Sequence, residues 1–131
     1  PPRPTPFPYP PLSRSDPTPP TIALSNPVDG GTVVKNTKGT VEWTIIETNQ
    51  IDESSLVYGD TISIIDTTIP ASASLVAGSI TYNSSTKKVT FTPANNWVAS
   101  ATFQAIVTTG FKDMAGNHLA APKIEQFSVT A

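Results

Sequence analysis

Apolar and polar residues alternate along most of the chain after residue 20. Val41, Trp43 and Ile45 occupy every second position of the segment 39–46. Successive side chains of a strand point to opposite faces, so this period predicts a strand with one buried and one solvated face. The alternation, together with turn residues between the segments, predicts further strands over residues 21–25, 32–35, 61–65, 79–83, 88–92, 102–108 and 124–130. No segment of ten or more residues has a helical period of 3.6, so the sequence predicts an all-β fold.

Turn residues divide these segments. The segment 32–35 is expected to continue the first strand after a kink at residues 26–31, which contain Asn-Pro and Asp-Gly-Gly. Residues 84–87 are expected to join two strands as a hairpin. Residues 52–55 predict a single helical turn, because Asp52 can cap free backbone N–H groups.

Composition limits the classes of function. Only 14% of the residues are charged, the net charge is −2, and there is no cysteine. Nucleic-acid binding needs a basic surface, so we expect none. Without cysteine there are no disulfides, thiolate metal sites or cysteine nucleophiles. No apolar run approaches the length of about 18 residues that a membrane helix needs, so no membrane insertion is expected.

Prolines divide the chain into two regions. Ten of the 14 prolines lie in residues 1–20. Proline lacks the N–H donor that helices and central strands require, so residues 1–20 are expected to form an extended arm or linker. Residues 21–131 have the size of one domain and are expected to form the β-sandwich.

The arm has a pattern of its own. From Arg3 to Pro10 every second residue is proline, so Arg3, Thr5, Phe7 and Tyr9 keep their N–H donors and direct them to one edge of an extended strand. These four residues are predicted to contact a neighbouring subunit by adding a strand to its sheet. The alternative is a stiff spacer between domains. Both interpretations stay open at this point.

Residues 110–120, Gly-Phe-Lys-Asp-Met-Ala-Gly-Asn-His-Leu-Ala, carry the most specific motif. They resemble the "G-[IV]-x-D-x-x-G-N-x-[LF]" element of bacterial Ig-like domains of the S-layer protein type. The segments 26–31, 91–93 and 127–130 resemble other landmarks of that family, whereas residues 45–48 depart from its usual Phe-Ser-Glu-Pro. The resemblance covers residues 20–131. It implies an Ig-like β-sandwich of about seven strands, used as a module of surface proteins, adhesins and large secreted enzymes, with no chemistry of its own.

The polar residues of this motif have two interpretations. Asp113 and Asn117 have the oxygen atoms that calcium prefers, but a calcium site needs about six or more oxygens. The favoured interpretation is a structural turn, in which Asp113 and Asn117 bond the local backbone and Gly116 adopts a positive φ.

Other candidate sites are few. His118 is the only histidine, no serine has a Gly-x-Ser-x-Gly context, and Asp52 and Glu53 are adjacent, so we expect no catalytic site, metal or cofactor. Trp97 is a candidate for stacking on a carbohydrate, and Asn83 begins a glycosylation sequon.

The sequence thus predicts a non-catalytic extracellular or cell-surface module. The leading hypothesis is a self-assembling surface or filament subunit, a homo-oligomer whose arm docks on a neighbouring subunit. The alternatives are a sugar-binding or adhesin module around Trp97, and a spacer domain between neighbouring domains of a large secreted protein.

Overall fold

The computed structural model describes residues 18–47 and 50–131. In these residues the prediction of an all-β fold is confirmed, but the strands number nine where about seven were expected. In chain order the elements are β1 (Thr21–Asn26), β2 (Thr32–Val33), β3 (Val41–Ile46), the 3-10 turn η2 (Glu53–Ser55), β4 (Ile62–Asp66), the 3-10 turn η3 (Pro70–Ser72), β5 (Ser74–Leu75), β6 (Gly78–Asn83), β7 (Lys88–Pro93), β8 (Thr102–Val107) and β9 (Lys123–Val129).

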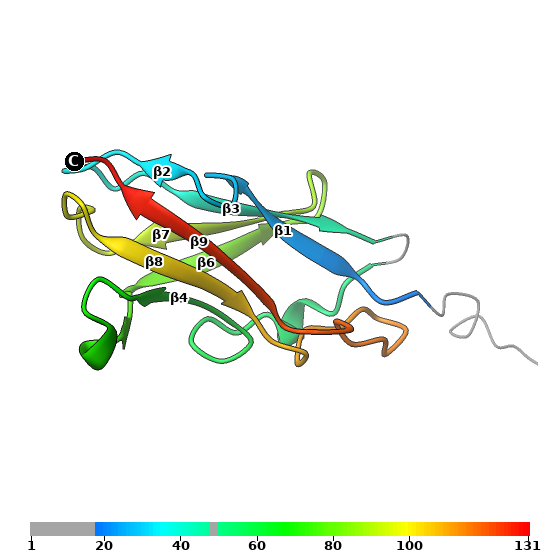
Figure 1. The fold of residues 1–131 in the computed structure, drawn as a ribbon. Helices are drawn as coiled ribbons and strands as arrows, with labels where there is room; N and C mark the ends of the chain where they lie inside the picture. The colour runs from blue at the N-terminus through cyan, green and yellow to red at the C-terminus, as the bar shows by residue number, and fades with distance from the viewer. Residues whose placement is uncertain (1–17, 48–49) are drawn as a thin grey trace, which may run out of the picture.

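The strands form two sheets that face each other (Figure 1). One sheet has the order β1-β3-β7-β6 and the other has the order β2-β9-β8-β4-β5. Neighbouring strands are antiparallel except for β2 and β9, which are parallel. The alternating apolar positions of the long strands lie between the two sheets, as the sequence pattern requires.

Two short strands were not anticipated in their final positions. The segment after the kink forms β2, but it pairs with β9 in the other sheet and not in the sheet of β1, with Val33 opposite Val129. β5 was missed altogether and pairs with β4, with Ile65 opposite Leu75. Strands of two residues are too short to show a period, and both depend on partners far away in the sequence.

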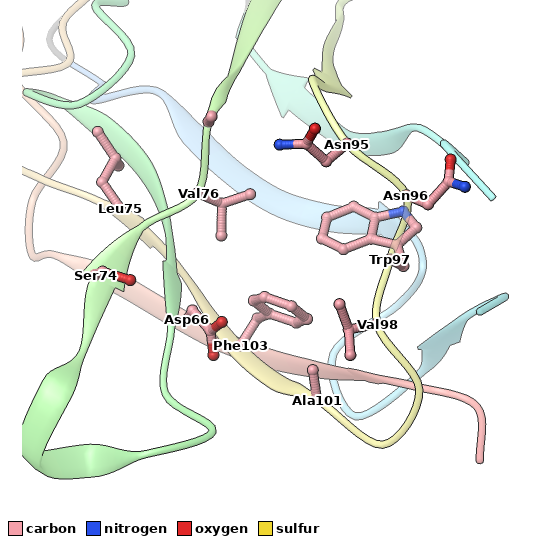
Figure 2. A pocket seen from close by; sticks show the side chains of 11 residues that line it. Asp66, Ser74, Leu75, Val76, Asn95, Asn96, Trp97, Val98, Ala101 and Phe103 are labelled. Carbon is pink, nitrogen blue, oxygen red and sulfur yellow. The ribbon is translucent and has the colours of Figure 1, made fainter. Parts of the chain in front are cut away.

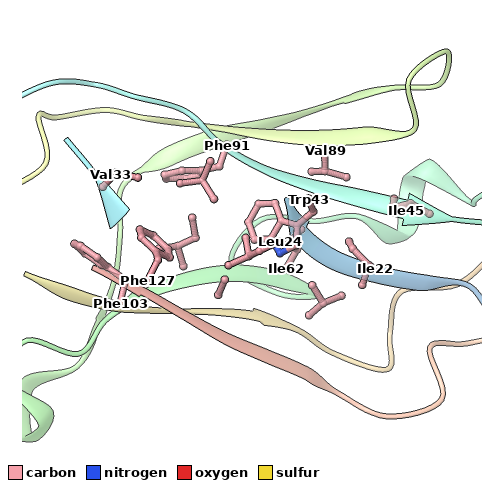
Figure 3. Close-up of a cluster of buried hydrophobic side chains, with 14 of the residues drawn as sticks. Ile22, Leu24, Val33, Trp43, Ile45, Ile62, Val89, Phe91, Phe103 and Phe127 are labelled. Atoms are coloured by element: carbon pink, nitrogen blue, oxygen red, sulfur yellow. The ribbon is translucent and has the colours of Figure 1, made fainter. Parts of the chain in front are cut away.

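The core fills the space between the sheets (Figure 3). Trp43 and Phe91 come from the β1-β3-β7-β6 sheet and are fully buried. Phe103 and Phe127 come from the opposite sheet, and their rings stack with centroids 5.2 Å apart. Aromatic side chains from both layers therefore hold the sandwich together.

The predicted helical turn at residues 52–55 is confirmed as η2. Asp52 caps it, because its carboxylate accepts a hydrogen bond from the backbone N–H of Ser54 at 3.1 Å. The backbone N–H of Asp52 in turn donates to the carbonyl oxygen of Lys112 at 3.0 Å. This turn thus connects the middle of the chain to the loop before β9.

The described chain begins and ends at opposite ends of the sandwich (Figure 1). Thr18 lies beside the start of β1, and Ala131 lies at the far end, beyond β9. Pro20, which the sequence pattern places in the arm, is fully buried and packs as part of the domain. No helix in the part of the chain that the structure describes is long and apolar enough to cross a membrane.

Candidate interaction site

A groove opens at the end of the sandwich where Ala131 lies. Residues 74–77 form one wall and residues 95–98 form the other, and Ala101 and Phe103 lie at its floor (Figure 2). Its volume is about 180 Å³. Leu75 and Val98 are exposed at the rim, Val98 with 70% of its surface accessible. The lining is mixed, because Asp66, Ser74, Asn95 and Asn96 also border the groove. Exposed apolar side chains that gather at the rim of a hollow are typical of binding surfaces.

Trp97 borders this groove but does not have the role that the sequence indicated. Its side chain is only 3% exposed, and its Nε1 donates a hydrogen bond to the carbonyl oxygen of Gly39 at 2.8 Å. Its ring packs against Phe103 and Phe127, at centroid distances of 5.1 and 5.7 Å. A ring enclosed in this way has no free face for a sugar, so the expectation of carbohydrate stacking at Trp97 is wrong.

A second feature begins at this groove and runs along the molecule. β6 is the outer strand of its sheet, and hydrogen bonds to β7 occupy only one of its edges. The N–H of Ala94 donates to the carbonyl oxygen of Ala77 at 3.0 Å, and the register continues with Ser79 opposite Thr92. Bonded and non-bonded pairs alternate in an antiparallel ladder, so Ser79 bonds to β7.

The intervening residues, Ile80 and Tyr82, direct their backbone groups to the outer edge. Their partners in the register are Phe91 and Val89, which also pair with Val41 and Trp43 of β3 on the opposite edge of β7. β6 therefore presents a free edge of N–H and C=O groups. The side chains of Ile80 and Tyr82 are partly buried and pack against the core.

Tyr58 holds the segment that leads into β6. Its hydroxyl group donates a hydrogen bond to the carbonyl oxygen of Val76 at 2.5 Å, and its ring centroid lies 4.9 Å from that of Phe91. Burial raises the pKa of Tyr58 to about 12. The neutral phenol of Tyr58 therefore helps to fix the groove wall at Val76 to the core, together with the hydrogen bond from the N–H of Val76 to the carbonyl oxygen of Ile64 at 2.9 Å.

The other sheet edges offer less to an incoming strand. β2 and β5 have two residues each. β1 is longer, but the N–H of Leu24 donates to Oε1 of Glu125 at 2.9 Å, and Glu125 is buried. A buried carboxylate thus occupies the middle of the β1 edge. Among the described residues, β6 is the long edge without such protection.

The motif at residues 113–117 forms a compact turn. Gly116 has a φ of +90°, the conformation that the turn interpretation requires. The backbone N–H of Asn117 donates to Oδ1 of Asp113 at 2.8 Å, and Nδ2 of Asn117 donates to Oδ2 at 3.1 Å. Both carboxylate oxygens of Asp113 are thus used inside the turn.

Asp113 is 1% exposed and also forms a hydrogen bond with the side chain of Glu47, which is buried at the end of β3. Burial acts to raise the pKa of Asp113, but the hydrogen bonds from Asn117, Glu47 and the backbone at Ala115 outweigh it, so its pKa is lowered. No group of three or more His, Cys, Asp or Glu side chains that could hold a metal occurs in residues 18–47 and 50–131.

The remaining predicted sites are separate from the groove. Asn83 is exposed at the β6–β7 hairpin, where its Oδ1 accepts hydrogen bonds from the backbone N–H groups of Ser85 at 2.9 Å and Thr86 at 3.2 Å. Arg3, Thr5, Phe7 and Tyr9 lie outside the described residues.

Sequence reasoning missed Glu125. Phe127 and Val129 lie on the buried face of their strand, and counting back by two from Phe127 places Glu125 on the same face.

The paired sheets and their shared core define an Ig-like β-sandwich. The chain belongs to the bacterial Ig-like domain family, whose model matches residues 16–129. No curated protein matches the sequence significantly.

Solved structures share the fold at low sequence identity. PcoC, a methionine-rich copper resistance protein from Escherichia coli, superimposes with a TM-score of 0.63 at 12% identity, over 83% of this chain and 98% of PcoC. CopC from Methylosinus trichosporium OB3b gives a TM-score of 0.53 at 18% identity, over 84% of this chain and 94% of CopC. At such identities the likeness extends to the fold alone.

Proposed function

We propose that this chain is a non-catalytic extracellular module that assembles with copies of itself, as a subunit of a surface layer or filament. The observation that carries the proposal is the placement of the two ends. Thr18, which follows the proline-rich arm, lies at one end of the sandwich, and the groove with the exposed apolar side chains of Leu75 and Val98 lies at the other. A module with its connecting segment at one end and exposed apolar side chains at the other is suited to end-to-end association.

Copper resistance, the role of PcoC, is not proposed for this chain. Copper(I) is bound by thiolate and thioether sulfur, and imidazole is a common copper ligand. This chain has no cysteine, one methionine and one histidine. Nδ1 of His118 lies 2.7 Å from the carbonyl oxygen of Thr109. The chain therefore offers one thioether and one imidazole as candidate copper ligands.

A spacer domain in a longer polypeptide is the second candidate, and the same placement of the ends favours it. Chain segments that enter and leave at opposite ends allow such domains to follow one another in a row. A spacer does not need to associate with copies of itself, whereas a subunit of an assembly does.

Negative-stain microscopy of the full chain over a series of concentrations separates the two functions. The assembly proposal predicts chains or filaments whose length increases with protein concentration. Single particles at every concentration would contradict it and leave the spacer function as the better account.

A further inference from the structure

We infer that the free edge of β6 is the acceptor for the arm of a neighbouring copy. The inference rests on the proposed self-assembly and names the surface where it occurs. In this arrangement residues 1–17 of one copy add a strand outside β6 of the next copy, and the β1-β3-β7-β6 sheet gains a fifth strand.

The backbone of β6 is open for such pairing. The N–H and C=O groups of Ile80 and Tyr82 face away from β7. Their partners in the register, Phe91 and Val89, direct their own backbone groups to β3 on the other side of β7. β6 contains no charged residue and no proline, the devices that commonly protect edge strands. Its six residues are about 20 Å long, enough for several ladder hydrogen bonds.

The arm has the complementary pattern. In the alternating run from Arg3 to Pro10, only Arg3, Thr5, Phe7 and Tyr9 carry an N–H group. All four N–H groups point to the same edge of an extended strand. The proline edge, which lacks N–H donors, would face outwards and could not recruit a further strand. One arm would therefore complete the sheet and end it.

The side chains fit the same arrangement. Residues opposite each other in a bonded pair place their side chains on the same face of the sheet. Ile80 and Tyr82 direct theirs to the core face, where they are only partly buried. Phe7 and Tyr9, paired with them, would lie on that face and cover the exposed parts of both side chains. The prolines would lie on the solvent face, with Ser79 and Thr81.

The length of the arm allows a second copy to be reached. Residues 1–17 can span about 55 Å when extended. The pairing needs only the residues from Arg3 to Pro10, so those from Pro11 onwards remain to bridge the two domains. The groove that Val76 lines lies just before the start of β6.

Amide hydrogen exchange of the full chain tests the inference. Exchange is measured at a concentration where light scattering shows monomers and at one where it shows assemblies. The amides of Ile80 and Tyr82 should exchange at least about tenfold more slowly in the assembly, whereas those of Ser79 and Thr81, bonded to β7, should be protected in both. The Phe7→Ser, Tyr9→Ser double variant should lose the concentration-dependent protection.

A pair of variants isolates the backbone contribution. Ile80→Pro removes an outward N–H group without removing a bond to β7, and Ile80→Ala removes the same side chain but keeps the N–H group. The inference predicts weaker association for Ile80→Pro than for Ile80→Ala.

Results that contradict the inference distinguish the β6 acceptor from the proposed assembly. Assemblies that form without a change at Ile80 and Tyr82 would overturn the β6 acceptor and leave the proposed assembly intact. Protection of these two amides that is independent of concentration would show that the chain's own arm occupies the edge. The absence of association at every concentration would overturn the acceptor and the proposed assembly together.

Discussion

Oε1 of Glu125 on β9 lies 2.9 Å from the backbone nitrogen of Leu24 on β1. This hydrogen bond joins the two sheets at one side of the sandwich and satisfies a buried N–H group at the edge of β1. We expect Glu125→Ala to destabilise the fold by about 1–3 kcal/mol, because it leaves that N–H group without an acceptor. Glu125→Gln keeps an acceptor oxygen and should cost less. Urea unfolding measures both free energies, and equal values for the two variants would contradict this role.

Gly116 occupies a conformation that β-branched residues rarely adopt, with a φ of +90° and open space where a Cβ atom would stand. Gly116→Val should therefore destabilise the domain by about 1–3 kcal/mol through backbone strain alone. Gly116→Asn is the matched control, because asparagine tolerates a positive φ, and it should retain most of the stability. Thermal unfolding distinguishes them. An unchanged melting temperature for the valine variant would show that the conformation of Gly116 imposes no such strain.

β6 lies tightly against the core at Gly78. A Cβ atom there would stand 2.4 Å from Cζ of Phe91 and 2.5 Å from the carbonyl oxygen of Thr92. Gly78→Ala should displace the start of β6 and cost about 1–3 kcal/mol of stability. Ser79→Ala, on the exposed face, is the control and should change little. Calorimetry of the two variants checks the difference, and equal stability would mean that β6 can move away from Phe91 freely.

The lowered pKa of Asp113 predicts a loss of stability in acid. A carboxyl group whose pKa is lower in the folded than in the unfolded state stabilises the fold above its unfolded pKa of about 3.9. That contribution is lost as the pH falls through the folded pKa. Unfolding free energies measured from pH 6 downwards should therefore fall more steeply in the wild type than in Asp113→Asn. Parallel profiles would show that the turn hydrogen bonds do not favour the ionised carboxylate.

The alternating pattern located the long strands because burial of one face imposes a period of two. It placed Val41, Trp43 and Ile45 on the core face of β3, where all three are buried. The pattern could not anticipate β5 or the sheet to which β2 belongs, because pairing with distant strands decides both. Trp97 was misjudged because the sequence identifies a loop but not whether that loop packs its side chains inwards.

The candidate site was only partly accessible to sequence reasoning. The alternation of prolines indicated an arm that can form backbone hydrogen bonds along one of its edges. Which strand could accept the arm depends on the order of strands in the sheets. Only the topology shows that β6 is an outer strand and that Glu125 occupies part of the competing edge of β1. The free edge of β6 and the groove beside it depend on contacts between strands that are far apart in the sequence, so sequence patterns do not reveal them.

Light scattering of the full chain and the Phe7→Ser, Tyr9→Ser variant tests most directly whether the chain works by assembly through its arm. Burying an aromatic anchor in a desolvated pocket can contribute about 2 kcal/mol or more, so loss of both should reduce association strongly. A variant with Ser13→Ala and Ser15→Ala, changed outside the alternating run, is the control. We expect a mass that increases with concentration for the wild type and the control, and a monomer for the double aromatic variant. The same mass for all three proteins would contradict it.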